Sequence, residues 1–169
     1  MMSSALRRMN QVGRPADRDQ AWLLDRDGTD RFVWQLDALL RRLGEVHLRI
    51  SLARLSIEGA DRQGLQLAQA IAENLLDPCA MAGSMPDGSV VAAFLGPRSG
   101  AGVAGDDEIA RRIRRRFQRA MSAVAVQATL GPSRLAIVHG WTDEICDPAA
   151  VTHELQVAPT VLVNHIQAA

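Results

Sequence analysis

The stretch GSMPDGSVVAAFLG, residues 83–96, contains the clearest turn signal in the chain. Its centre, PDGS at residues 86–89, is typical of a tight turn, because proline, aspartate and glycine each suit one position of such a turn. An apolar run follows the turn at residues 90–95, and a shorter one precedes it at residues 79–82. The pattern predicts a β-hairpin with its tip at Asp87-Gly88.

Upstream of the hairpin, the spacing of apolar residues predicts a helix, a strand and a second helix. The first helix covers residues 29–43 and ends at Gly44. Residues 46–57 alternate with a period of two, but the last apolar residues fall out of phase with the first, which predicts a β-bulge near Ala53-Arg54. The second helix covers residues 60–76 and is stopped by Asp77-Pro78.

Downstream, an amphipathic helix is predicted over DDEIARRIRRRFQRAM, residues 106–121. Its apolar residues are spaced by four and form one stripe: Ile109, Ile113, Phe117 and Met121. A strand at residues 133–141 and a short helix capped by Asp147 follow. The stretch APTVLVNHI, residues 158–166, leaves two interpretations open, because Pro159 suits the first turn of a helix whereas the valines after it favour a strand.

The predicted order is therefore a helix, then β-α-β-β-α-β, then a helix. This order predicts an α+β fold with a ferredoxin-like or nucleotide-cyclase-like core, a mainly antiparallel sheet flanked by helices, and an extra N-terminal helix. Such cores usually carry their helices on one face. The length of 169 residues suits one domain, residues 18–169, and the polar residues 1–17 predict a mobile tail.

Composition argues against two classes of partner. Lysine and arginine (19) balance aspartate and glutamate (19), so no overall field attracts nucleic acid or an anionic membrane. The chain has no tyrosine and three phenylalanines, a poor supply for stacking bases. No apolar run reaches membrane-spanning length, and the first residues lack an apolar signal core. With only two cysteines, we expect a cytoplasmic protein.

Two further patterns favour plain structural interpretations. GAGVAG, residues 100–105, has the letters of a dinucleotide-binding loop, but the acids at 106–108 would repel a pyrophosphate, so we interpret it as a flexible loop. Four possible zinc ligands lack the close spacing of such sites, and we interpret them as chance scatter. They are His139, Cys146, His153 and His165.

In order and spacing, residues 24–166 resemble a GGDEF domain, the module of bacterial diguanylate cyclases. Arg31 matches an arginine that this family has before an amphipathic helix, and Asp30 stands for its asparagine. Gly140 matches the family's strand ending Ser-Ile-Gly-Val, and HELQVAPTVLV, residues 153–163, resembles its closing helix in two positions. LRISLARLSI and GLQLAQAIAENL resemble its first strand and following helix.

The resemblance also locates the family's catalytic motif, Gly-Gly-Asp/Glu-Glu-Phe, at the tip of the hairpin, where this chain departs from it. The resemblance implies that the first acid binds metal and that the glycines admit a guanine nucleotide. Asp87 could replace one acid, but the glycine pair is absent. The place of the second metal ligand, residues 53–56, holds Arg54 and no carboxylate. Two Mg²⁺ ions on a triphosphate require oxygen ligands.

We therefore predict a degenerate GGDEF-like domain that is not an enzyme and has no catalytic residue, metal or cofactor. Its hairpin tip would be a vestigial active site, made of Pro86, Asp87, Gly88 and Ser89. The expected function is signalling or regulation through a protein partner. The alternative is a non-catalytic module that binds a guanine nucleotide or cyclic di-GMP, and a homodimer is left open.

Six arginines on the predicted helix at residues 106–121 are the candidates for partner contact. They could form a face that binds an anion or an acidic protein, or they could be the solvated side of an amphipathic helix. We predict a partner- or anion-binding role for Arg112, Arg115, Arg116 and Arg119.

Overall fold

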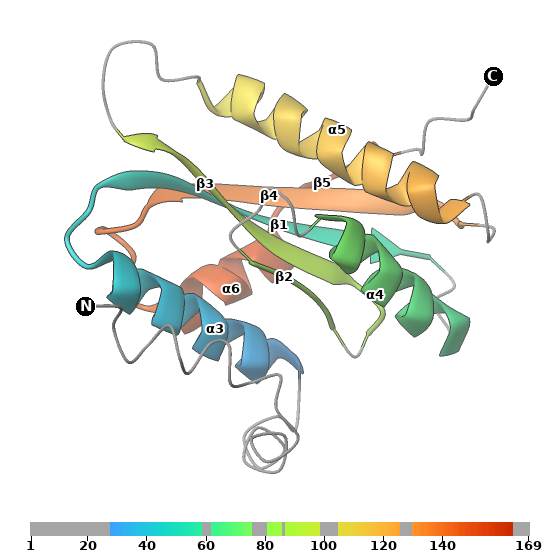
Figure 1. Cartoon of the computed structure of the whole chain (residues 1–169), viewed down its shortest axis with the longest axis horizontal. Coiled ribbons are helices and arrows are strands. Elements are labelled where there is room, and N and C mark those ends of the chain that lie inside the picture. Colours follow the sequence, from blue (N-terminus) through green and yellow to red (C-terminus); the bar gives the residue numbers. More distant parts are fainter. Residues whose placement is uncertain are drawn as a thin grey trace.

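The computed structural model describes residues 28–58, 62–75, 81–85, 87–98, 105–125 and 130–163 (Figure 1). The predicted tail at residues 1–17 and most of the glycine-rich loop lie outside these ranges. The elements within them follow in the order α3 (Gly28–Leu43), β1 (Leu48–Ile57), α4 (Arg62–Leu75), β2 (Met81–Ser84), β3 (Val90–Arg98), α5 (Asp106–Ala125), β4 (Ser133–Trp141), α6 (Pro148–Val157) and β5 (Thr160–Val163).

The strands form one five-stranded sheet in the order β2-β3-β1-β4-β5, with every neighbouring pair antiparallel. The strands of the β-α-β-β-α-β core thus lie with the first strand between the third and fourth, which is the arrangement of a split β-α-β unit. The predicted fold class, an antiparallel α+β sheet with flanking helices and an extra N-terminal helix, is confirmed.

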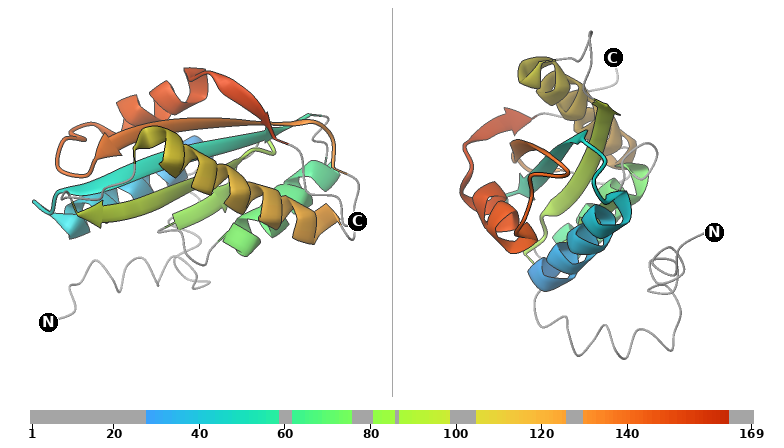
Figure 2. Two further views of the ribbon diagram at one scale, coloured as in Figure 1. Left: turned by 90° about the horizontal axis from the view of Figure 1, so that it is seen from above. Right: turned by 90° about the vertical axis from the view of Figure 1, so that its left-hand side faces the viewer.

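Helices cover both faces of the sheet, whereas the sequence led us to expect them mainly on one. Figures 1 and 2 show α4 and α5 on one face and α3 and α6 on the other. Each face has its own buried apolar cluster. Phe117 and Leu55 belong to the cluster under α4 and α5, and Leu36 and Leu52 belong to the cluster under α3 and α6.

The two-sided burial explains the phase change in β1, where we predicted a bulge near Ala53-Arg54. That prediction is wrong, because residues 50–55 pair without interruption with β3, and residues 49–57 do so with β4. Ile50 and Leu52 face α3 and α6, and Leu55 and Ile57 face α4 and α5, as expected from the alternation of side chains along a strand. The irregularity lies at the other end of the strand pair, between residues 48 and 50 of β1.

The hairpin forms where the sequence predicts it. Met85 and Ser89 close the loop, with the Met85 amide donating to the Ser89 carbonyl at 2.8 Å, and the Gly88 amide donates back to the Met85 carbonyl at 2.9 Å. Gly88 has a φ of 80°, in the left-handed region that favours glycine. Gly44 ends α3 in the same region with a φ of 59°.

Helix α6 and strand β5 are the last two elements. The Asp147 carboxylate accepts hydrogen bonds from the amides of Ala149 and Ala150, which fixes the start of α6 as predicted. Residues 160–163 form strand β5, so of the two interpretations left open the strand is correct, and the resemblance to a closing helix does not extend to this segment.

Among the described residues, no helix combines the length and the apolar character needed to cross a membrane.

Candidate functional site

The hairpin tip holds an internal ion pair. Arg54, on the neighbouring strand β1, places its Nη2 2.6 Å from Oδ2 of Asp87, with the Arg54 side chain 22% exposed and the Asp87 side chain 53% exposed. The other carboxylate oxygen of Asp87 accepts hydrogen bonds from the amide (2.9 Å) and the hydroxyl (2.6 Å) of Ser89. Both oxygens of the one acid at the tip are therefore already engaged within the chain.

The electrostatics of the tip favour a charged Asp87. Burial alone would raise the pKa of its carboxyl, but the hydrogen bonds from Ser89, together with Arg54, outweigh burial and hold that pKa below its ordinary 3.8. The Arg54 guanidinium occupies the position beside the carboxylate that a cation would need. A metal ion would have to displace it and lose that charge-assisted hydrogen bond.

The solvent face of α5 carries most of the arginines that the sequence singled out. Arg111, Arg115 and Arg119 are exposed and are spaced by four, so they extend along one side of the helix for about 12 Å. Arg112 is also exposed and forms an ion pair with Glu108 one turn earlier. We call Arg111, Arg112, Arg115 and Arg119 the arginine stripe.

Arg116, a residue we predicted to contact a partner, is placed differently. It is half-buried, and its guanidinium lies over the ring of Phe94, 5.6 Å from the ring centroid. This position ties it to the packing of α5 on the sheet. Arg111 belongs to the stripe instead. Helical spacing could have identified Arg111 as part of the stripe, because it lies four residues before Arg115 and therefore on the same side of the helix.

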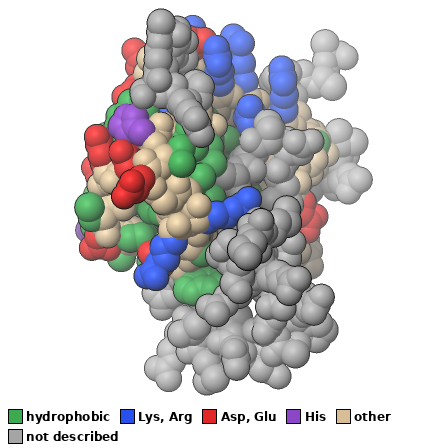
Figure 3. All heavy atoms as spheres, turned by 60° about the vertical axis from the view of Figure 1, so that its left-hand side comes forward, with side chains coloured by type: hydrophobic (Ala, Val, Ile, Leu, Met, Phe, Trp, Pro, Cys, Tyr) green, Lys and Arg blue, Asp and Glu red, His purple; other side chains and the backbone are tan. Residues whose placement is uncertain are grey.

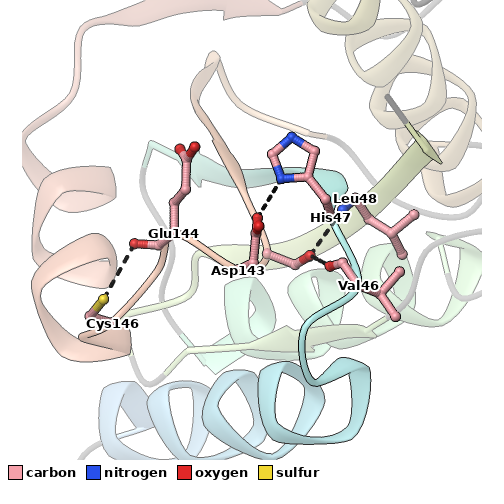
Figure 4. A network of polar contacts seen from close by, with 7 residues as sticks. Val46, His47, Leu48, Asp143, Glu144 and Cys146 are labelled. Atoms are coloured by element: carbon pink, nitrogen blue, oxygen red, sulfur yellow. Dashed lines mark hydrogen bonds and ion pairs between the residues drawn. The ribbon is translucent and has the colours of Figure 1, made fainter. Parts of the chain in front are cut away.

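Aromatic and basic side chains gather where β1 begins and β4 ends. The rings of His47 and Trp141 stack with centroids 4.1 Å apart, and the Arg49 guanidinium lies 5.0 Å from the Trp141 centroid. Nδ1 of His47 lies 2.6 Å from a carboxylate oxygen of Asp143 (Figure 4). Arg49 also forms an ion pair with Asp106, at the start of α5.

A buried threonine fastens the same two strand ends together. The Thr142 hydroxyl donates to the Val46 carbonyl at 2.5 Å and accepts from the Leu48 amide at 3.1 Å (Figure 4). Further along the same loop, the Cys146 thiol donates to the Glu144 carbonyl at 3.7 Å. The Thr142 contacts could not be read from sequence spacing, because the partners lie 94 and 96 residues apart.

His139, Cys146 and His153, the candidate zinc ligands within the described residues, do not gather into a metal site. Nδ1 of His139 lies 2.8 Å from the hydroxyl of the buried Ser51. Burial lowers the pKa of His139 below its ordinary 6.5. Asp106 opposes that shift and Arg49 adds to it. Within the described ranges, no three His, Cys, Asp or Glu side chains gather as a metal site requires, and His165 lies outside them.

Comparisons of the chain with protein-family models, with curated proteins and with solved structures find no match. The resemblance to GGDEF domains therefore stays a prediction that depends on the order and spacing of sequence patterns.

Proposed function

We propose that this protein is a non-catalytic, GGDEF-like regulatory domain that binds an acidic surface of another protein through the arginine stripe of α5. The observation that carries the proposal is the exposure of all four stripe arginines on a helix whose other side already packs on the sheet. Within the described residues, only Arg112 of the four has an ion-pair partner. The fold does not require the remaining three charges.

The apolar side of α5 accounts for its attachment. Ile113, Phe117 and Met121 are buried against the sheet and α4. Exposed ion pairs contribute about 0–1 kcal/mol each, so the arginines add little to folding. A row of unpaired guanidinium groups suits carboxylates on a partner, since arginine binds a carboxylate through two parallel hydrogen bonds.

The hairpin tip supports the non-catalytic part of the proposal. Arg54 stands where the resemblance would require a metal-binding acid, and it neutralises Asp87, the one acid at the tip. A nucleotidyl transfer site needs carboxylates free to hold Mg²⁺ against a triphosphate. Asp87, the one carboxylate at the tip, is already engaged in the ion pair with Arg54.

We place this activity in the cytoplasm. Cys146 is exposed and is a free thiol. Exposed thiols persist in a reducing compartment and tend to oxidise elsewhere.

The test compares partner capture by two triple variants with equal charge. The stripe variant carries Arg111→Gln, Arg115→Gln and Arg119→Gln, and the control carries Arg31→Gln, Arg41→Gln and Arg42→Gln on exposed positions of α3. Glutamine is about as good a helix former as arginine, so both should fold with stability changed by less than about 1 kcal/mol.

We expect proteins captured from the native cell by the unchanged chain to be retained by the α3 control and lost by the stripe variant, with the largest difference at low salt. Equal capture by both variants would contradict the proposal. Calorimetric titration with GTP and with cyclic di-GMP is the second arm, and tight binding of either would favour the nucleotide-binding alternative instead.

A further inference from the structure

In the part of the chain that the structure describes, the outer edge of β4 is paired along only part of its length. β5 pairs with residues 133–136 and stops there, and its first residue follows Pro159, which has no amide to donate. Within the described residues, no strand lies beside the outer edge of Ile137–Trp141. All five of these residues are partly exposed. Figure 2 shows the short β5 beside one end of β4 and α6 beside the other.

A groove of about 300 Å³ lies next to this free edge. One wall is the end of β4, and the other is formed by the loop after it and by α6. Its apolar lining comes from strands β1 and β4, the loop after β4, and helix α6. These residues are Ile50, Leu52, Val138, Ile145 and Val151. The Thr142 hydrogen bonds anchor the start of this loop to the start of β1.

The rim of the groove is acidic. Glu144 and Glu154 line it, are exposed, and form no ion pair with any described residue. Residues 142–157 include four acids and no lysine or arginine. Figure 3 shows several acidic side chains near one another at the left of the view, with tan and green atoms between them. An occupant with positive charge at its flanks therefore complements this rim.

We propose that the free edge of β4 binds an extended peptide segment in which apolar and basic residues alternate. The segment adds a strand beside Ile137–Trp141, so its backbone satisfies the unpaired strand edge. Its apolar side chains that point to the α6 side enter the groove, and neighbouring lysine or arginine side chains reach Glu144 and Glu154. This surface is separate from the arginine stripe, which selects for the opposite charge.

The test uses a panel of dye-labelled peptides in which lysine alternates with valine, isoleucine, leucine or phenylalanine. Two matched peptides accompany each one: in the first, glutamate replaces lysine, and in the second, alternate backbone nitrogens are methylated so that the ladder cannot form. Binding is followed by fluorescence anisotropy, and the position of the bound peptide by hydrogen exchange of the β4 amides.

Two substitutions on α6 form a matched pair. Ala150 is exposed and lines the groove, whereas the neighbouring Ala149 is exposed and does not line it. Ala150→Trp should fill the groove and weaken binding by about tenfold or more, while Ala149→Trp should change it by less than about twofold. Glu144→Gln with Glu154→Gln should weaken it by about threefold, as expected for exposed charge pairs.

We expect at least one lysine peptide to bind the native chain and to slow exchange at Ile137–Trp141, with both of its matched peptides binding at least about tenfold more weakly. Three results would overturn the proposal: no binding by any peptide of the panel, binding that Ala150→Trp leaves unchanged, or protection that appears on α5 instead of β4. Self-association of the unliganded chain that protects residues 137–141 would also overturn it, since a second copy would then cover the edge.

Discussion

Replacing Phe117 by alanine separates the structural side of α5 from the side that we propose binds a partner. The Phe117 ring is fully buried between α5, α4 and the sheet, at 0% exposure. It contacts the Phe94 ring edge-on, with centroids 6.2 Å apart and ring planes at 65°. The substitution removes both the buried ring and this aromatic pair, and it leaves the arginine stripe intact.

The expected loss of stability follows from the burial of the ring. Truncation of a fully buried phenylalanine to alanine costs about 3–5 kcal/mol, which combines the lost transfer of the ring from water with the cavity left behind. Edge-on aromatic pairs contribute about 0.5–1.5 kcal/mol beyond the burial of their area. We therefore expect a loss in the upper part of the range of about 3–5 kcal/mol. For a chain of this size, each kcal/mol lowers Tm by about 2–4 °C, which gives a fall of about 6–20 °C.

The measurement is urea unfolding followed by circular dichroism, with Arg115→Gln on the solvent face of the same helix as the control. Arg115→Gln should change the free energy of unfolding by less than about 0.5 kcal/mol. A loss below about 1 kcal/mol for Phe117→Ala would refute the account of α5, because a ring in that position cannot then be part of the core.

Three further results are expected. Gly131→Ala should destabilise the fold by more than about 1 kcal/mol, because a Cβ there would lie 2.7 Å from the Glu58 carbonyl oxygen. Gly83→Ala is the control, since Gly83 has open space around the position of a Cβ, and it should be close to neutral. Thermal unfolding measures both. Asp87→Asn should cost at most about 1 kcal/mol near neutral pH, given the exposure of Asp87 and the resulting screening. Because the folded chain holds the pKa of Asp87 below 3.8, this stabilisation is complete above that pH and fades as pH falls through the acid range, so urea midpoints of the two proteins should converge there. The purified chain should form no cyclic di-GMP from GTP with Mg²⁺ or Mn²⁺, and measurable product in a chromatographic assay would show that the tip is not inert.

Local patterns were enough to predict most of the fold. The turn at Asp87-Gly88, the Asp147 cap and the apolar stripe of α5 each depend on residues close in sequence, and all three are confirmed. The error in β1 has a physical cause. A strand buried on both faces need not keep its apolar residues in one phase, so the switch from Leu52 to Leu55 does not require a bulge.

The candidate site was harder to predict than the fold, because it is formed by contacts between segments that are distant in the sequence. The sequence identified Arg54 as unsuited to a metal site, but its ion pair with Asp87 requires that β1 and β3 lie side by side. Arg116 was grouped with the exposed arginines, because helical spacing alone does not reveal that the Phe94 ring lies beneath it. The edge groove was not predicted, since its lining comes from β1, β4, the loop after β4 and α6, which only the fold brings together.

Site-specific photo-cross-linking in the native cell tests the central claim most directly. A photoreactive amino acid replaces either Arg115, in the middle of the arginine stripe, or Arg41, which is also exposed, on α3. If α5 binds a protein partner, position 115 should yield a discrete cross-linked protein that position 41 does not, and the added substitutions Arg111→Gln and Arg119→Gln should abolish it. Cross-links from position 41 but not from position 115, or no discrete product from position 115, would contradict the account.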